Sequence, residues 1–241
     1  MESAALLKPI LIVGIGGLGV PAVCALARAG ARRLGLVDPD AIELSNLPRQ
    51  VIYTVRDIGR RKADAAAAYL GERYPGLVCD VYRFALDESN AVRLVSDHAF
   101  VIDATDDPAT KFLINDTCIA LERPFIYAGV LATSGQAMTV LPGRTACLRC
   151  LFEEPPAADE SASCRDAGIL GPVAAVIGEI EAAEAIRAVS GERPEIAGKI
   201  LTYNAASANI RVVEVGARAG CACGAAGQVV DKAAAQAARH H

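Results

Sequence analysis

The chain of 241 residues contains no tryptophan, and aromatic residues make up only 5% of it. Its core must therefore be built from Ala, Val, Leu and Ile, which suits a globular protein because 53% of the residues are hydrophobic. A polybasic run is also missing, and the formal net charge is -4. This excludes the electrostatic footprint of a protein that binds nucleic acid or an anionic membrane surface.

Long apolar runs are missing as well. The longest one near the start, residues 9–13, is too short to span a bilayer and lacks the basic flank and cleavage site of a signal peptide. We therefore expect a cytoplasmic protein that does not enter the membrane. Eight cysteines in a long chain of this kind indicate metal or sulfur chemistry rather than disulfides.

Short apolar segments alternate with longer segments of helical periodicity in the first half of the chain. We predict strands at residues 10–13, 33–37, 77–84, 100–102 and 125–127. We predict helices at residues 18–28, 60–73, 89–95 and 108–120. Unbroken apolar strands with helices between them imply a parallel sheet covered on both faces, which is the doubly wound, Rossmann-like α/β fold.

The pattern changes after residue 127. Residues 133–141, 199–203 and 209–215 predict antiparallel C-terminal strands, and residues 172–189 predict a long helix. A segment rich in Pro, Glu and Asp, at about residues 151–165, predicts a mobile crossover loop. We expect one nucleotide-binding domain over residues 1–225, with an appended C-terminal lobe and a tail at residues 226–241.

A glycine-rich turn follows the first predicted strand. Gly14, Gly16, Gly17 and Gly19 lie between this strand and the first helix, where backbone N–H groups and the helix dipole favour a phosphate. Asp38 ends the next strand, about 20 residues later, where a ribose hydroxyl is expected. A purely structural turn is the alternative, and enzymes that bind NAD share the same motif.

The polar segment DPDAIELSNLPRQ, residues 38–50, favours ATP over NAD. Asn46, Arg49 and Gln50, together with Lys62, would lie on the loop and helix start after the second strand and donate to phosphate oxygens. Asp106 would follow the fourth strand, at the edge where such sheets bind ligands, and can hold a magnesium ion. These residues predict a triphosphate site, whereas isolated basic residues more often form a solvated surface.

Two cysteine pairs lie about 70 residues apart, Cys147-x-x-Cys150 and Cys221-x-Cys223. Four thiolates suit a tetrahedral zinc ion that is structural, because the protein fills all four positions. The alternative is a set of free surface thiols. We expect zinc to join the C-terminal lobe to the rest of the domain.

The motifs GIGGLG, DPD, LSNLPRQ, Lys62 and ATDD occur in the order and spacing of the ThiF/MoeB/HesA enzymes, which are similar to ubiquitin-activating enzymes. The chain resembles this family from residue 10 to about residue 223. The resemblance implies an ATP-dependent adenylyltransferase that activates the C-terminal carboxylate of a small ubiquitin-like sulfur-carrier protein with a Gly-Gly tail. Pyrophosphate leaves, and sulfur transfer follows.

Roles for individual residues come with this resemblance. Asp38 would bind the ribose, and Asp106 would coordinate magnesium and orient the attacking carboxylate. The implied nucleotide-binding residues are Gly14, Gly16, Gly17, Asp38, Asp40, Asn46, Arg49, Gln50, Lys62 and Asp106. The implied catalytic residues are Arg49, Lys62, Asp106 and Cys164. The implied cofactors are ATP, Mg²⁺ and Zn²⁺, with zinc held by Cys147, Cys150, Cys221 and Cys223.

Cys164 precedes the long helix, and in relatives that pass sulfur onward the matching cysteine takes a persulfide or a covalent link to the carrier. Its position before a predicted helix start, beside Arg165, favours the thiolate. An inert cysteine kept for packing is the equal alternative. Cys24, Cys79 and Cys118 fall on apolar faces and are predicted to belong to the core.

The chain departs from the family at several positions. Relatives carry an N-terminal arginine that reaches the neighbouring subunit's ATP site, whereas no arginine precedes Arg28 here. Asp107 and Lys111 stand where relatives usually have Asn and Arg, so an extra carboxylate would strengthen magnesium binding or raise one carboxyl pKa. Relatives also have two residues between the last two zinc cysteines, and this chain has one.

The resemblance also implies partners. We expect a homodimer, with residues 171–177 in its interface, and a separate sulfur donor protein, because no rhodanese-like domain follows Cys223. One alternative is a nucleotide-binding scaffold with reduced activity that needs a partner subunit. A second, an NAD-dependent dehydrogenase, leaves Arg49, Lys62 and the paired cysteines unexplained.

Overall fold

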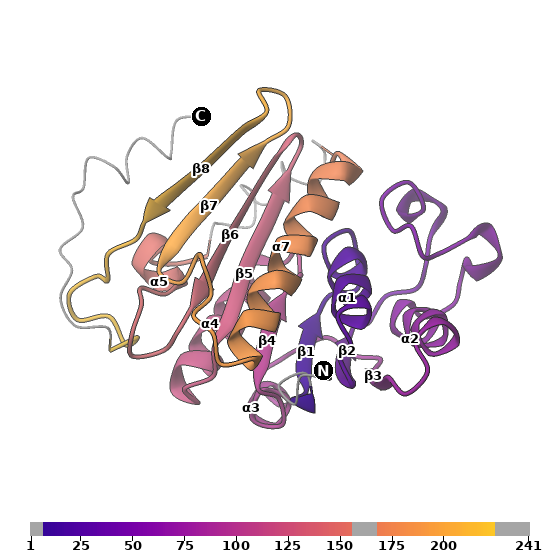
Figure 1. The fold of residues 1–241 in the computed structure, drawn as a ribbon, viewed down its shortest axis with the longest axis horizontal. Coiled ribbons are helices and arrows are strands. Elements are labelled where there is room, and N and C mark those ends of the chain that lie inside the picture. The colour runs from indigo at the N-terminus through magenta and orange to yellow at the C-terminus, as the bar shows by residue number, and fades with distance from the viewer. Residues whose placement is uncertain (1–6, 156–167, 225–241) are drawn as a thin grey trace.

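The computed structural model describes residues 7–155 and 168–224. An eight-stranded sheet runs through it in the order β3-β2-β1-β4-β5-β6-β7-β8 (Figure 1). The pairs among β1 to β5 that lie side by side are parallel, and those from β5 to β8 are antiparallel. The strands are β1 (Ile10–Val13), β2 (Arg33–Val37), β3 (Val78–Tyr82), β4 (Phe100–Asp103), β5 (Phe125–Leu131), β6 (Ser134–Val140), β7 (Lys199–Asn204) and β8 (Asn209–Glu214).

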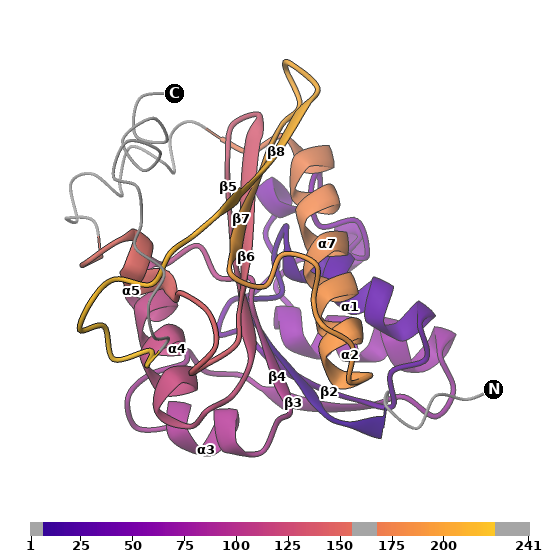
Figure 2. The ribbon, with the colours of Figure 1, turned by 60° about the vertical axis from the view of Figure 1, so that its left-hand side comes forward.

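Helices cover both faces of the sheet. Figure 2 shows α1, α2 and α7 on one face and α3, α4 and α5 on the other. The α-helices are α1 (Gly19–Arg28), α2 (Lys62–Arg73), α3 (Ala91–Ser96), α4 (Pro108–Ala120), α5 (Leu148–Leu151) and α7 (Gly171–Val189), and the 3-10 helices are η2 (Leu44–Asn46) and η3 (Val55–Asp57). Two layers of helix around a parallel sheet confirm the doubly wound fold with antiparallel C-terminal strands.

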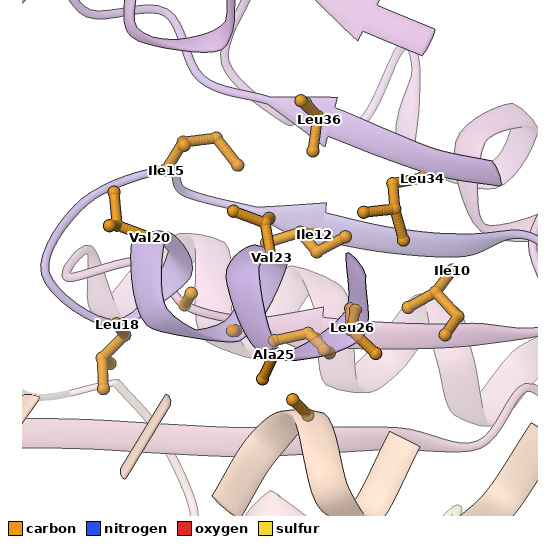
Figure 3. Close-up of a cluster of buried hydrophobic side chains, with 14 of the residues drawn as sticks. Ile10, Ile12, Ile15, Leu18, Val20, Val23, Ala25, Leu26, Leu34 and Leu36 are labelled. Atoms are coloured by element: carbon orange, nitrogen blue, oxygen red, sulfur yellow. The ribbon is translucent and has the colours of Figure 1, made fainter. Parts of the chain in front are cut away.

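The core consists of aliphatic side chains on the two faces of the parallel strands. All four residues of β1 are buried, because helices cover both of its faces. Figure 3 shows the side chains of β1 and β2 against those of α1, with Ile12, Val23 and Leu36 among them. Small residues bring α7 close to α1, since a Cβ atom at Gly178 would lie 2.4 Å from the Leu18 carbonyl oxygen.

The order of the strands places a crevice in the sheet. β1 pairs with β2 on one side and with β4 on the other. The sheet therefore extends from β1 toward β2 in one direction and toward β4 in the opposite direction. At such a switch point the loops after the strands separate and leave room for a ligand at the carboxyl ends. The glycine turn after β1 and the segment after β4 both lie there.

Several predicted boundaries were wrong by a few residues, for local reasons. β3 ends at Tyr82 and not at residue 84, because its neighbour β2 ends at Val37, the partner of Tyr82. α3 begins at Ala91, because Asp87 and the residues after it form a hydrogen-bonded turn. β5 runs on to Leu131 because it forms a hairpin with β6.

The second half of the chain also corrects the predictions. Residue 151, assigned to the crossover loop, belongs to α5, and the rest of that loop from residue 156, with the tail at 226–241, lies outside the described residues. Of residues 171–177, Val173, Ala174 and Ile177 are buried within one protomer and Pro172, Ala175 and Val176 are exposed, so the dimer interface expected of this segment stays a prediction. Among the described helices, none has the length and apolar character needed to cross a bilayer.

Candidate functional site

The glycine turn between β1 and α1 has two kinds of glycine. Gly14 has φ +92°, and a Cβ atom there would lie 2.7 Å from the Ala104 carbonyl oxygen after β4. A Cβ atom at Gly19 would lie 1.9 Å from the Gly14 carbonyl oxygen. The fold itself therefore requires these two glycines. Gly16 and Gly17 differ, because added Cβ atoms there would make only ordinary contacts at 3.5 Å.

The packing of the protein itself therefore does not explain why glycine stands at positions 16 and 17. Among the residues that the structure describes, no acceptor is present for the N–H of Gly16 or Gly17. Bare backbone with free N–H groups before a helix is the arrangement that accepts a phosphate. The turn therefore fits an anionic ligand.

Asp38, at the end of β2, connects this strand to the glycine turn. Its carboxylate accepts from the Ile15 N–H at 2.7 Å and from the Asp40 N–H at 2.8 Å. Burial raises the pKa of the Asp38 carboxyl, while the Lys62 charge and the two backbone N–H groups act in the opposite direction. Both oxygens already hold the loop in place, and each keeps a lone pair for a further donor such as a ribose hydroxyl.

Lys62 is the first residue of α2, which begins two residues later than predicted, and it lies beside Asp40. Its Nζ is 2.7 Å from Asp40 Oδ2, and the Lys62 side chain is only 9% exposed while that of Asp40 is 62% exposed. The ammonium group is therefore held in one place near the carboxyl end of β2. An anion that approaches would meet a fixed positive charge.

The turn after β2 carries the remaining predicted donors. Asn46 is buried and its Oδ1 accepts from the Glu43 N–H, so it shapes the turn. The Arg49 side chain passes Gly17 at 3.7 Å from the position of an added Cβ atom, and its guanidinium donates to the Ser45 carbonyl oxygen. Arg49 thus lies beside the glycine turn, whereas the contacts of Asn46 are with its own loop after β2.

Gln50 lies at the same end of the turn, against the glycine loop. The residue is 2% exposed, and its Nε2 lies 3.5 Å from the position of an added Cβ atom at Gly16. Oε1 has no partner among the described residues. A buried acceptor without a donor is costly, so a donor belongs at this point in the working protein.

Asp106 and Asp107 follow β4, and their carboxylates have different surroundings. Asp107 caps α4, accepting from the Thr110 N–H at 2.8 Å and the Thr110 hydroxyl at 2.7 Å. Asp106 is exposed and makes no hydrogen bond or ion pair with the described residues. Asp106 is therefore the carboxylate available to a metal ion, and the extra carboxylate of Asp107 serves the helix.

A buried charge cluster next to Asp106 was not predicted. Lys111 Nζ lies 3.1 Å from Asp103 Oδ1 and donates to the Ala128 carbonyl oxygen at 2.6 Å. Burial raises the pKa of the Asp103 carboxyl to about 6, against the effect of Lys111. Glu181 of α7 is fully buried, and neither of its carboxylate oxygens has a partner among the described residues.

Burial also raises the pKa of Glu181, with Lys111 acting in the opposite direction and Asp103 in the same one. The sequence does contain a signal for such a group: two glutamates, Glu181 and Glu184, stand three positions apart along an apolar helix. Glu184 accepts from the Thr139 hydroxyl and from two backbone N–H groups. The sequence pattern alone does not show which of the two buried glutamates has hydrogen-bond donors for its carboxylate and which has none among the described residues.

The four paired cysteines come together at α5, which has Cys147 as its N-cap and contains Cys150. Their Sγ atoms all lie within 4.8 Å of one another. Cys147 Sγ is 4.0 Å from Cys150 Sγ and 3.6 Å from Cys221 Sγ, and Cys150 Sγ is 3.7 Å from Cys223 Sγ. These separations are too long for disulfides. A tetrahedral ion with metal–sulfur distances of about 2.3 Å requires sulfur separations of about 3.8 Å.

The cluster therefore fits a metal ion, and the single residue between Cys221 and Cys223 does not prevent both from facing it. The backbone N–H of Arg218 donates to Cys150 Sγ at 3.4 Å. The hydrogen bond with Cys147 and, to a smaller extent, the one from Arg218 lower the pKa of the Cys150 thiol, while the pKa of the Cys147 thiol is raised by the same hydrogen bond.

The other cysteines divide into two groups. Cys118 is buried, and Cys24 and Cys79 pack partly buried against the core, as predicted. Cys164, predicted to be catalytic, lies outside the described residues.

Comparisons with known proteins identify the family and the fold. The model of the ThiF family matches residues 6–225. The Aspergillus niger protein named "Adenylyltransferase and sulfurtransferase uba4" is 44% identical over 191 residues, which are 76% of this chain and 40% of that protein. The Arabidopsis thaliana protein named "Adenylyltransferase and sulfurtransferase MOCS3" is 36% identical over 217 residues, which are 90% of this chain and 47% of that protein.

Among solved structures, that of E. coli MccB with ATP superimposes with a TM-score of 0.78 at 22% sequence identity. The match covers 91% of this chain and 67% of that one, and it shows a shared fold. The chain spans less than half the length of the two relatives named above. From the extent of the family match and the identity of these relatives, the chain belongs to the ThiF family.

Proposed function

We propose that the protein uses ATP to adenylate the C-terminal carboxylate of a small ubiquitin-like sulfur-carrier protein with a Gly-Gly tail. A carboxylate oxygen attacks the α-phosphorus of ATP, a phosphorus–oxygen bond forms, and the bond to the bridging oxygen of the β-phosphate breaks. Pyrophosphate leaves and an acyl adenylate remains. No proton is transferred in this step, so catalysis depends on positioning and charge.

One observation carries the proposal: the glycine turn, Asp38 and Lys62 converge at the carboxyl ends of β1 and β2. Asp38 binds the backbone of the turn directly, and Lys62 is held at the same strand end by Asp40. Arg49 borders Gly17 of the same turn. A dehydrogenase needs the turn but not this grouping of positive charge, which suits a triphosphate.

A magnesium ion would be held by Asp106, the exposed carboxylate after β4 that makes no hydrogen bond or ion pair with the described residues. When bound, it supplies positive charge beside the phosphates, as metal ions do in phosphoryl transfer. We propose zinc for the cysteine cluster, because four thiolates at tetrahedral spacing suit it. Zinc would be structural there, since the four sulfurs leave no open position.

The proposal includes partners. The names of the two relatives describe both adenylyl transfer and sulfur transfer, so we propose that the activated carrier accepts sulfur from a separate donor protein. We also propose a homodimer. The β2–α2 connection exposes Leu44, Val51 and Val55, at 67%, 78% and 68%, and such an apolar surface is typical of an interface.

The test is carrier-dependent exchange of labelled pyrophosphate into ATP. Purified protein is mixed with ATP, magnesium and each of a panel of ubiquitin-like carriers ending in Gly-Gly, and a carrier without its last glycine serves as the matched control. We expect exchange with at least one intact carrier and none with its truncated form. ATP binding without exchange for the whole panel would contradict the assigned substrate.

A further inference from the structure

Tyr53 stands between the glycine turn and the start of α2, at the end of the turn that carries Arg49 and Gln50. The residue is 5% exposed. Its hydroxyl lies 3.1 Å from the Ile15 carbonyl oxygen and 3.2 Å from the Lys62 carbonyl oxygen. One side chain therefore contacts both the loop that fits a phosphate and the first residue of the helix that presents the ammonium group.

The hydroxyl can act there only as a donor. A carbonyl oxygen accepts and does not donate, so the single phenolic proton is shared between the two carbonyls. Burial raises the pKa of Tyr53, and the Asp38 carboxylate acts in the same direction. The phenol therefore keeps its proton at neutral pH.

Ile15 is fixed by its neighbours on all sides. Its N–H donates to Asp38, its carbonyl oxygen accepts from Tyr53, and its side chain is fully buried beside β1 and α1 (Figure 3). In a planar trans peptide the carbonyl group and the following N–H point in opposite directions. Because Tyr53 holds the Ile15 carbonyl, the Gly16 N–H points away from Tyr53, where no acceptor is present among the described residues.

From this geometry we propose that Tyr53 is a positioning residue for the nucleotide phosphates. Its hydroxyl sets the direction of the Gly16 N–H as a phosphate donor and fixes the start of α2, which carries Lys62. It contacts neither phosphate nor carrier itself. This inference rests on the proposed function, since it assigns the anion at the glycine turn to a phosphate of ATP.

The experiment compares the full chain with Tyr53→Phe, which removes only the hydroxyl. Tyr82→Phe, on the edge strand β3, is the matched control. Dissociation constants are measured for ATP, AMP and adenosine. Loss of one neutral hydrogen bond predicts about three- to tenfold weaker binding of ATP and AMP by Tyr53→Phe. Adenosine has no phosphate, so its affinity should be unchanged, as should all three affinities of Tyr82→Phe.

Three results would overturn the inference. Unchanged affinities of Tyr53→Phe would show that the hydroxyl does not position the phosphate donors, and an equal loss for adenosine would show general loosening of the site. Failure of the unsubstituted protein to bind ATP would overturn the proposed function and this inference with it.

Amide NMR of the unsubstituted protein keeps the inference testable if Tyr53→Phe does not fold. The Gly16 amide signal should move when AMP is added and move much less with adenosine. A Gly16 signal that does not respond to AMP would also overturn the assignment.

Discussion

The nucleotide end and the cysteine end of this protein are ordered in different ways. At the nucleotide end, the glycine turn, Asp38 and the start of α2 are held by their own backbone and side-chain hydrogen bonds. At the cysteine end, two segments more than 70 residues apart in the chain meet around four sulfur atoms, and the Arg218 N–H donates to Cys150 Sγ between them. The first end has its shape through its own hydrogen bonds, whereas the second gathers four thiols at the spacing that suits a shared metal ion.

This difference separates the expected effects of substitutions. Where the protein's own bonds fix a site, changing a residue that faces the ligand should reduce activity and leave the fold stable. Where a metal ion joins the segments, losing one ligand should reduce stability, because metal binding is coupled to folding. Each prediction below tests one side of this comparison.

Removing one metal ligand should have the largest effect. Cys150→Ser should abolish metal binding and lower the free energy of unfolding by at least about 3 kcal/mol, because the ion's binding energy is lost and two segments separate. For a chain of this size the melting temperature should fall by roughly 6–12 °C. Elemental analysis and thermal unfolding measure both quantities.

Cys79→Ser is the matched control, since this cysteine is partly buried on β3, far from the cluster. It should keep the full metal content and lose little stability. A Cys150→Ser variant that melts with the unsubstituted protein would show that the cysteine end is ordered without an ion, and the contrast between the two ends would disappear.

Replacing Lys62 should have the next largest effect, on activity. Lys62→Gln removes a fixed charge beside the proposed phosphate site, so carrier-dependent pyrophosphate exchange should fall about 100- to 1000-fold. The free energy of unfolding should change by less than about 1 kcal/mol, since the partner Asp40 is mostly exposed and regains water.

Arg61→Gln provides the control for Lys62, because Arg61 is the preceding residue and an exposed cation that donates to the Pro39 carbonyl oxygen. It should keep most of the exchange activity. Equal losses in the two variants would mean that general positive charge matters and that the position of Lys62 does not.

The sequence predicted the nucleotide end through local patterns. A buried strand, a glycine turn and a helix follow one another along the chain, so periodicity and spacing were enough to place Gly14 and Lys62 on the correct elements. The cysteine pairs were also found from spacing. That the two pairs meet could be expected only from metal chemistry, because nothing local links residue 150 to residue 221.

Contacts between distant side chains were beyond the reach of the sequence. Asp107 looked like an additional charge at the metal site, yet its carboxylate caps α4, and the two choices differ by one rotation of the side chain. Tyr53 was not singled out, because its importance depends on two carbonyl groups that the fold brings together. Glu181 was missed for the same reason: its environment is set by α1 and by the strands β4, β5 and β6, against which α7 packs.

The pH dependence of stability offers a smaller effect at the nucleotide end. The pKa of Glu181 is raised above its ordinary value of 4.5 in the folded state, so the folded protein binds more protons than the unfolded chain above that pH. Stability should therefore fall as pH rises from about 4.5. Glu181→Gln should remove this part of the slope and be more stable at pH 8 by on the order of 1–3 kcal/mol.

Urea unfolding from pH 4.5 to pH 8 measures this slope. The Asp103 carboxyl, whose pKa is raised to about 6, contributes a decline of the same sign between its ordinary 3.8 and that value, and this part should remain in the variant. Glu179→Gln is the control, because Glu179 lies on the same helix, half exposed and paired with Arg28. A slope that is identical in Glu181→Gln and the unsubstituted protein would mean that Glu181 is ionised and paired in solution.

The smallest effect concerns the two adjacent carboxylates after β4, where structure and proposed chemistry meet. Asp107→Ala removes the cap of α4 and should lower the free energy of unfolding by about 1 kcal/mol, while Asp107→Ser, which can still accept from Thr110, should lower it less. At saturating magnesium, both variants should keep the pyrophosphate exchange of the unsubstituted protein, apart from the fraction of protein that is unfolded. Asp106→Asn should show the reverse. Its stability should be unchanged, because the Asp106 carboxylate makes no hydrogen bond or ion pair with the described residues, and its pyrophosphate exchange should require more magnesium. If Asp107→Ser also raised the magnesium requirement, the Asp107 carboxylate would belong to the metal site as well as to the helix. The segment after β4 would then depend on its ligand, as the cysteine end does.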